Sequence, residues 1–549
     1  MSIRSCALML AALFLATTAW AQHEHGAPAA SSAPPPLYGD LGSWTHPVTT
    51  ASPKAQKYFA QGLRLYYGFN HDEAIRAFHE AARLDPKCAM AWWGVALSAG
   101  PNINLPMDED HGKIALEAVG HAAALAKGVR AADRDYIGAL LTRYSARPDA
   151  RRGALDSAYC AAMRKLAKRY PADADAAALF AESILDLNPW NQWAQDGQPN
   201  PGTLEAVATL EALLAKHPDH PGANHFYIHA VEASNHPERA LAAARRLETM
   251  VPGAGHLVHM PSHIYARTGQ YREALEQNRK AVAVDEKYIA EQSPQGAYPL
   301  MYYNHNIQFI WFSASMEGRS AEAIAAARKM VGNLPPEVIA QMSMLELAPP
   351  YPIMTLVRFG RWDEALAEPA PPPSERYARG VWHCARGMAA AGKGDLAGAA
   401  AALDSVRVAA ARVPADMIIS INSAPLLLRI ATNALAGDLA AHRKRGEEAL
   451  RALRLAVAEE DSLHYDEPPT WYFPVRHTLG AALLQFGQAK EAEAVYREDL
   501  RRHPENGWAL AGLANALRAQ GNTQEATAVD ARFRKAWADA DIKLVASAY

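Results

Sequence analysis

A repeat of 34 residues that contains histidines constrains this chain more than any other feature of its sequence. His225 and His229 lie four residues apart, and so do His259 and His263, each 34 residues after its counterpart. The stretch from His217 to His263 holds eight of the 21 histidines within 47 residues. A fixed offset of this size is typical of repeat architectures. We therefore interpret the stretch as one structural unit that is used twice.

The first clear unit follows a proline-rich leader. Residues 58–86 read YFAQGLRLYYGFNHDEAIRAFHEAARLDP, and their apolar residues recur at helical spacing in two runs that are separated by residues 68–71. The small residue Gly62 lets two helices approach closely, Phe78 fills the space between them, and Pro86 ends the second helix. The pattern predicts a helix–turn–helix unit.

The sequence of this unit resembles the tetratricopeptide repeat, a pair of antiparallel helices 34 residues long. With Gly62 at the family's position 8, the family's signature positions 20, 24, 27 and 32 are filled by Ala74, Phe78, Ala81 and Pro86. The resemblance implies an all-α fold, a right-handed superhelical solenoid of antiparallel helix pairs. The best-matching units are residues 55–88, 89–100, 221–254, 255–288, 304–337, 473–506 and 507–540, with insertions at 101–110, 187–202 and 289–303.

The start of the chain predicts export. Arg4 precedes an apolar core over residues 7–15, and a small-residue cleavage pattern follows at residues 19–21. This is typical of a secretory (Sec) signal peptide over residues 1–21, which is too short to span a membrane by itself. We expect an exported protein of the bacterial periplasm that is not an integral membrane protein.

After the signal peptide, the composition predicts a disordered leader and one domain. Residues 22–52 are rich in His, Pro and Ala, a composition that favours disorder, and a single solenoid domain is expected over residues 53–549. The net charge of −3 without a basic block argues against nucleic acid as a partner. The remaining cysteines are compatible with one disulfide and a free thiol or with three buried thiols: Cys88, Cys160 and Cys384.

The repeat register gives the histidines equivalent places in successive units. We number each unit from the alanine at its position 20. In the first unit, positions 5, 9 and 12 are His225, His229 and Glu232. In the second unit, positions 2, 5 and 9 are His256, His259 and His263, and position 2 of the third unit is His305. The resemblance implies that positions 2, 5, 9 and 12 line a concave groove in which ligands bind. Helical spacing independently places residues i, i+3, i+4 and i+7 on one face of a helix.

Neutral imidazoles beside a carboxylate form a ligand set that transition metals prefer. We therefore predict that these six histidines and Glu232 bind a metal ion, zinc or copper. Pro261 disturbs the helix, which makes the directions of His256 and His259 less certain than that of His263. Further residues of the groove or of its surroundings are Asn224, Asn304, Gln308, the soft sulfur of Met260, and the loop residues Trp190 and Trp193.

Two other functions fit the same groove. A peptide or protein ligand could bind there through hydrogen bonds from His and Asn, or His and Glu232 could serve an enzyme as acid and base or as ligands of a catalytic metal. The zinc-protease helix needs Glu directly after its first His, whereas Phe226 and Met260 occupy that place here. That mechanism of peptide hydrolysis is therefore set aside, and the sequence does not identify a substrate.

Overall fold

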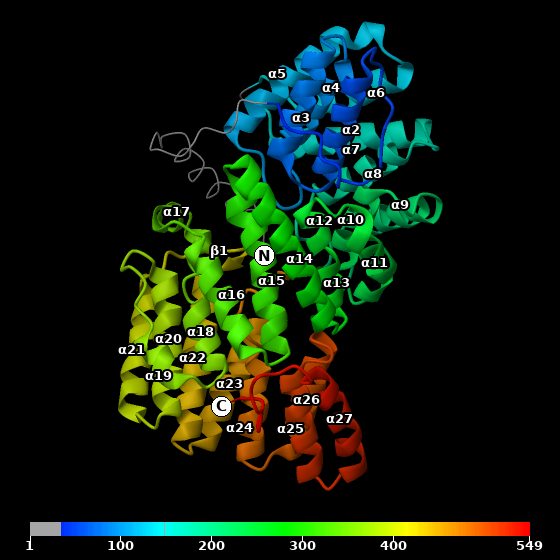
Figure 1. Cartoon of the computed structure of the whole chain (residues 1–549). Helices are drawn as coiled ribbons and strands as arrows, with labels where there is room; N and C mark the ends of the chain where they lie inside the picture. The colour runs from blue at the N-terminus through cyan, green and yellow to red at the C-terminus, as the bar shows by residue number, and fades with distance from the viewer. Residues whose placement is uncertain (1–33, 148, 549) are drawn as a thin grey trace. The chain divides into compact units, whose positions relative to one another are not determined.

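The computed structural model describes residues 34–147 and 149–548. The fold is all-α, as predicted, and consists of tetratricopeptide-like helix pairs in which consecutive helices pack together (Figure 1). The three cysteines after the signal peptide are free and buried. Within the described ranges, no helix combines the length and the apolar character needed to cross a bilayer. The predicted signal peptide and the first part of the leader lie outside the described residues.

The described residues form two compact units along the stretch predicted as one solenoid domain, residues 53–549. The N-terminal unit comprises the described residues up to Ile264 together with Gln277–Asn306, and the C-terminal unit comprises Tyr265–Glu276 and the residues from Ile307 onward. Single hydrophobic cores stop growing beyond about 250–300 residues, so a chain of this length divides.

The helices of the N-terminal unit begin with the first predicted repeat. They are α2 (Pro53–Tyr67), α3 (His71–Leu84), α4 (Ala89–Ser98), α5 (Glu109–Leu125), η2 (Ala126–Gly128), α6 (Ala131–Leu140), η3 (Leu141–Arg143), α7 (Arg152–Arg169), α8 (Ala174–Leu185), α9 (Thr203–Lys216), α10 (Pro221–Val231), η4 (Pro237–Ala240), α11 (Leu241–Met250), α12 (Gly255–His259) and η5 (Tyr298–Tyr302). Three helices have residues in both units: α13 (Pro261–Arg267), α14 (Tyr271–Gln292) and α15 (Tyr303–Met316).

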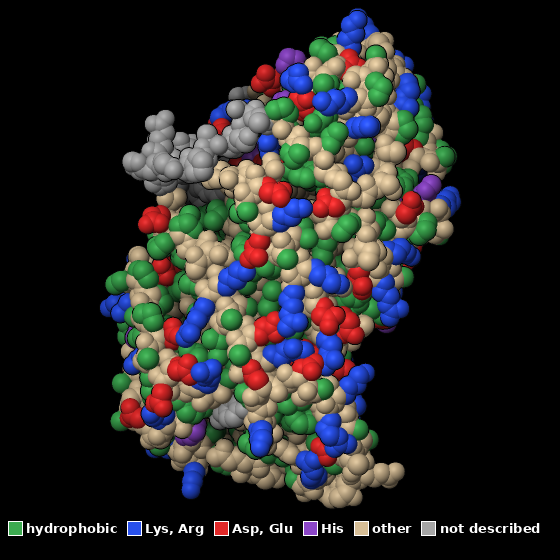
Figure 2. Space-filling model, viewed as in Figure 1, with side chains coloured by type: hydrophobic (Ala, Val, Ile, Leu, Met, Phe, Trp, Pro, Cys, Tyr) green, Lys and Arg blue, Asp and Glu red, His purple; other side chains and the backbone are tan. Residues whose placement is uncertain are grey.

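The C-terminal unit continues the pattern and adds one short hairpin. Its helices are α16 (Ser320–Gly332), α17 (Pro336–Gln341), η6 (Ser343–Leu347), α18 (Tyr351–Arg358), α19 (Trp362–Ala367), α20 (Arg376–Gly392), α21 (Leu396–Arg412), α22 (Ala424–His442), α23 (Gly446–Asp461), α24 (Val475–Gln485), α25 (Ala489–Arg502), α26 (Gly507–Ala519) and α27 (Thr523–Ala536). Strands β1 (Ile418–Ile419) and β2 (Asn422–Ser423) pair antiparallel. On the face shown in Figure 2, basic and acidic side chains are interspersed.

A buried aromatic side chain locks successive helices together in the first repeat. Phe78 has no exposed surface, and a Cβ atom built on Gly62 or Gly94 would lie 2.8 or 2.4 Å from its ring. In the C-terminal unit Tyr496 packs in the same way between Gly480 and Gly512. The aromatic residue and each of its two glycines are separated by 16 residues in both cases. These contacts explain why the repeat needs small residues opposite position 24.

Residues 34–52 are ordered, although they belong to the leader that we expected to be disordered. Leu41 is buried, and the side chains of Trp44 and His46 donate hydrogen bonds of 3.0 and 2.9 Å to the carboxylate of Asp175 in α8. The overall composition of the leader gave no sign of these few anchoring side chains. Their contacts offset the entropic cost of ordering the segment.

In the C-terminal unit, His477 is buried between groups of opposite charge. Its Nδ1 accepts a hydrogen bond from the Arg358 guanidinium at 2.9 Å, and its Nε2 donates to Asp499 at 2.9 Å. Burial lowers the pKa of His477, and the charge of Arg358 lowers it further, against the opposite effect of Asp499. The ring is therefore neutral when the protein is folded at neutral pH.

Replacing Phe78 by Ala should destabilise the protein by about 3–5 kcal/mol, because the truncation leaves a cavity between two glycines that cannot fill it. Urea unfolding followed by circular dichroism measures the change. Lys87→Ala, at an exposed position of the same repeat, should leave the unfolding midpoint nearly unchanged. Equal midpoints for the Phe78 variant and the wild type would contradict this packing.

Lowering the pH from 7.5 to 5.5 should destabilise the fold partly through His477. Since its pKa is lower when folded than when unfolded, the unfolded chain binds the proton first, and stability is lost as the pH falls below about 6.5. Urea midpoints at the two pH values should differ less for His477→Asn than for the wild type. His236→Asn, at an exposed histidine, should keep the wild-type difference.

Candidate metal centre

Four helices of the N-terminal unit bring the predicted histidines together. Helix α10 supplies two of them one turn apart, α12 and α13 supply three, and the start of α15 supplies the last: His225, His229, His256, His259, His263 and His305. As predicted, Pro261 interrupts the helix, since α12 ends at His259 and α13 begins at Pro261. Five of the rings are at most 2% exposed, and His305 is half-buried. The histidines thus form a buried cluster rather than the wall of an open groove.

The ring nitrogens of the cluster fall into two triads. The first triad consists of His225, His229 and His256, and the second of His259, His263 and His305. Within each triad, one ring nitrogen per residue lies within 4.8 Å of the others. Three imidazole nitrogens at this separation can converge on one metal ion after small side-chain rotations, because zinc–nitrogen bonds are about 2.0–2.1 Å long.

Glu232 connects the two triads. Its Oε1 accepts a hydrogen bond from Nδ1 of His229 at 2.7 Å, and its Oε2 accepts one from Nδ1 of His263 at 2.5 Å. Each of these histidines therefore holds its proton on Nδ1 and presents the lone pair of Nε2. Metal-binding histidines commonly donate their other N–H to a carboxylate in this way. Glu232, which we predicted as a ligand, thus fixes the orientation of two of the predicted histidines.

Two other rings are fixed by neutral acceptors. Nδ1 of His225 donates to the backbone oxygen of Tyr67 at 2.7 Å, and Nδ1 of His259 contacts Oδ1 of Asn278 at 2.7 Å, while the amide of Asn278 donates to Ser262. With the proton on Nδ1, the Nε2 atoms of both rings also carry lone pairs.

Several Nε2 atoms lie close to one another, an arrangement that favours the binding of a cation between them. Nε2 of His259 lies 2.8 Å from Nε2 of His263, although both rings hold their proton on Nδ1. Nε2 of His256 lies 3.2 Å from that of His225. In the part of the chain that the structure describes, no hydrogen-bond partner reaches Nε2 of His229 or Nδ1 of His256. Buried nitrogens without partners are costly, and metal coordination would satisfy them.

Burial keeps three rings of the cluster neutral at neutral pH. Burial lowers the pKa values of His225, His256 and His259 well below the usual value, and neighbouring imidazoles lower them further. Burial alone would raise the pKa of Glu232, but the charges and hydrogen bonds of His263 and His229 outweigh it and lower this pKa to about 2. A deprotonated imidazole nitrogen is the form that binds metal.

Aromatic side chains enclose the first triad. Phe69, in the turn between α2 and α3, lies 4.4 Å from the ring of His225, 6.0 Å from that of His229 and 5.4 Å from that of His256, measured between ring centroids. Trp190 lies 5.9 Å from His229. Both residues have positive φ, 54° for Phe69 and 57° for Trp190, which costs a non-glycine residue about 1–3 kcal/mol.

The sequence did not reveal Phe69, Asn278 or Tyr302, whose ring lies 4.9 Å from that of His256. Phe69 occupies a turn, Asn278 follows the predicted first helix of its unit, and Tyr302 lies in a predicted insertion. Helical periodicity gives none of these positions a place beside the histidines. Their contacts depend on packing between segments that are distant in the sequence.

The other predicted residues have mixed outcomes. Trp193 donates from Nε1 to the backbone oxygen of Ala230 and so fixes the loop 187–202 on α10. Asn224 donates hydrogen bonds to the backbone oxygens of Pro218 and His220, and Asn304 donates one to the backbone oxygen of Leu300. Gln308 donates to the hydroxyl of Tyr351 within the C-terminal unit. Met260 is buried but belongs to neither triad. The predicted role of these residues in the surroundings of the histidines stays a prediction.

A third group of possible ligands has a structural role. His46, Asp173 and Asp175 lie close enough to hold an ion. However, the carboxylate of Asp175 already accepts hydrogen bonds from His46 and from the hydroxyl of Tyr67, and Nε2 of His220 lies 3.3 Å away. Burial would raise the pKa of Asp175, but the hydrogen bonds from His220 and His46 hold it well below its usual value. This network anchors residues 34–52.

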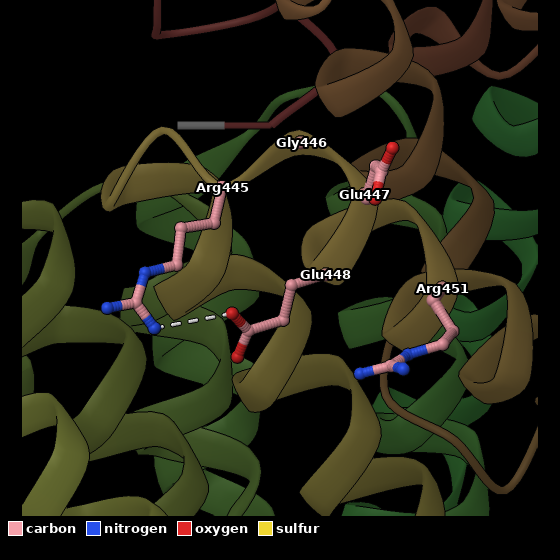
Figure 3. Close-up of a pocket in the computed structure, with 5 residues that line it drawn as sticks. All are labelled: Arg445, Gly446, Glu447, Glu448 and Arg451. Atoms are coloured by element: carbon pink, nitrogen blue, oxygen red, sulfur yellow. Dashed lines mark hydrogen bonds and ion pairs between the residues drawn. The ribbon is translucent and has the colours of Figure 1, made fainter.

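The C-terminal unit has a hollow of about 540 Å³ on its surface at the start of α23 (Figure 3). Its lining consists of Arg445, Gly446, Glu447, Glu448 and Arg451, and Arg445 forms an ion pair with Glu448 at 3.4 Å. These side chains are solvated charges without an imidazole, so the hollow is unrelated to the histidine site.

Comparisons with known proteins add little to this geometry. No protein-family model and no curated protein matches the sequence. Among solved structures, the chain is similar to a human IFIT1 dimer with m7Gppp-AAAA (12% identity, 90% of this chain and 92% of that chain, TM-score 0.33). It is also similar to yeast Tom70 (14%, 87% and 96%, 0.32) and to Cut9 in the APC/C Cut9–Hcn1 hetero-tetramer (14%, 88% and 76%, 0.28). Scores this low do not assign the chain to a family, and the site is argued from its own residues.

Proposed function

We propose that this tetratricopeptide-like protein binds transition-metal ions, zinc or copper, in the buried histidine cluster of its N-terminal unit. The observation that supports this most strongly is the division of six imidazoles into two triads of convergent nitrogens. Lowered pKa values keep rings in both triads neutral, and Glu232 orients one ring of each triad. Imidazole nitrogen suits zinc and copper, whereas calcium and magnesium prefer oxygen ligands.

The geometry disfavours peptide binding through these buried histidines and acid–base catalysis by Glu232. Imidazoles that are at most 2% exposed cannot donate hydrogen bonds to a peptide in a groove. An acid–base role for Glu232 is opposed by its pKa of about 2 and by its two histidine partners. A catalytic metal is compatible with the site, because three histidine ligands leave a fourth position for water or substrate.

We also propose that the protein acts outside the cytoplasm, on the basis of the signal-peptide pattern in residues 1–21. An exported protein encounters zinc and copper in a compartment that also permits disulfides, yet the three described cysteines are unpaired thiols. Histidine rather than thiolate ligation would suit such a compartment, since imidazole does not oxidise to a disulfide.

Untagged wild-type protein should contain zinc or copper in at least stoichiometric amount, measured by elemental analysis after gel filtration. His229→Ala and His263→Ala should each lower the metal content, because each removes a lone pair that Glu232 orients. Adding zinc to apo-protein should raise the thermal midpoint, since only the folded state presents the site.

His236→Ala provides the matched control for these variants. His236 belongs to the same histidine-rich stretch but is exposed and paired with Glu238. Its replacement should leave both metal content and the zinc-dependent shift at wild-type values. Absence of bound metal, together with absence of a thermal shift with either zinc or copper, would refute the proposed function.

Expression in a bacterium with two membranes should yield a mature protein that begins at Gln22 in the periplasmic fraction, because the cleavage pattern ends at Ala21. Intact-mass spectrometry of the fractionated protein tests this. An unprocessed chain in the cytoplasmic fraction would contradict export, without affecting the proposed metal binding.

A further inference from the structure

The distances between the ring nitrogens limit how many of the six histidines can bind one ion. Metal–nitrogen bonds of about 2.0–2.1 Å restrict the ligands of one ion to nitrogens within about 4 Å of each other. The structure places the six histidines in two groups of three, and within each group the nitrogens lie within 4.8 Å of one another. One ion therefore satisfies one triad and leaves the three imidazoles of the other without a ligand bond.

We propose that the centre is dinuclear, with one transition-metal ion in each triad, and that Glu232 couples two ions that differ in their access to solvent. This inference rests on the proposed metal binding and extends it to the number, coupling and exchange of the ions. Each triad would supply three imidazole nitrogens to its ion.

The triads are close enough for coupling. The rings of His229 and His263, one from each triad, have centroids 5.7 Å apart, and so do those of His256 and His259. Glu232 accepts one N–H from His229 and one from His263. A cation on Nε2 makes the N–H at Nδ1 more acidic and strengthens its bond to the carboxylate. The negative charge between the triads also offsets the repulsion between two cations.

Access to the triads differs because their surroundings differ. The first triad is buried: His225, His229 and His256 are at most 2% exposed, and the ring of Phe69 lies 4.4–6.0 Å from their rings, measured between centroids. In the second triad, His305 is half-buried. A chelator or water molecule can approach an ion beside His305 without displacing Phe69. The ion of the second triad should therefore exchange faster.

Zinc release tests the number of ions and their access. Untagged wild-type protein is saturated with Zn²⁺, freed of excess metal and mixed with an excess of a colorimetric zinc chelator. We expect two equivalents of zinc per chain, released in two phases of equal amplitude whose rates differ at least tenfold. One equivalent in total, or two equivalents released in a single phase, would overturn the proposal.

Variants assign the phases to the triads. His305→Ala should remove the fast phase, and His225→Ala should remove the slow phase, each with loss of one equivalent. Glu232→Gln should accelerate both phases by about 10–100-fold, because its amide can no longer accept from both histidines. If the Glu232 variant changes one phase alone, the coupling is refuted. Circular dichroism shows which variants fold, and the wild-type release curve decides the number of ions without them.

Two further variants separate this proposal from other outcomes. His236→Ala should leave both phases unchanged. The double variant His23→Ala and His25→Ala tests whether the leader holds the second ion. Two equivalents in this variant support the dinuclear centre, whereas the loss of one equivalent would overturn it. Absence of bound zinc and copper from wild-type protein contradicts the proposed function itself, which is a different result from the binding of one ion.

Discussion

The pair of hydrogen bonds from His229 and His263 to Glu232 determines what the centre can do. A carboxylate buried without partners would be protonated or would destabilise the fold. Here the two imidazoles keep it ionised, and in return it fixes the proton of each ring on Nδ1. The lone pairs of both Nε2 atoms thus become available on the side away from Glu232. One carboxylate orders one imidazole in each triad, so the triads cannot be considered separately.

The helix pairs position the other histidine rings of the cluster. The one-turn spacing in α10 aligns His225 and His229, and the interruption at Pro261 redirects the chain between His259 and His263. Backbone and amide acceptors, the carbonyl of Tyr67 and the side chain of Asn278, fix two further rings. Buried imidazoles need such partners, because each nitrogen without one lowers the free energy of unfolding. That free energy is small for any domain.

The sequence predicted the helix pairs and the gathering of six histidines, because both follow from the 34-residue repeat and from helical spacing. The contact of Phe78 with two glycines shows why that register is reliable: a residue of the wrong size would clash or leave a cavity. The register does not specify the hydrogen-bond partners of a side chain. Asn224 bonds to the start of its own helix, Gln308 lies beyond the end of the N-terminal unit, and Glu232 bonds to two histidines. Phe69 could not be predicted, because a turn residue acquires its neighbours only through tertiary packing.

The hydrogen bond between His225 and Tyr67 joins residues that are 158 positions apart in the chain. Together with Phe69 and His305, it makes the centre a product of nearly the whole N-terminal unit. During synthesis, the first 304 residues alone lack His305, and an unfolded chain presents only isolated histidine pairs. A metal ion cannot nucleate this fold as it does in a zinc finger. Under the proposed metal binding, loading must follow folding, and the metals available in the compartment where the chain folds would determine the occupant of the site.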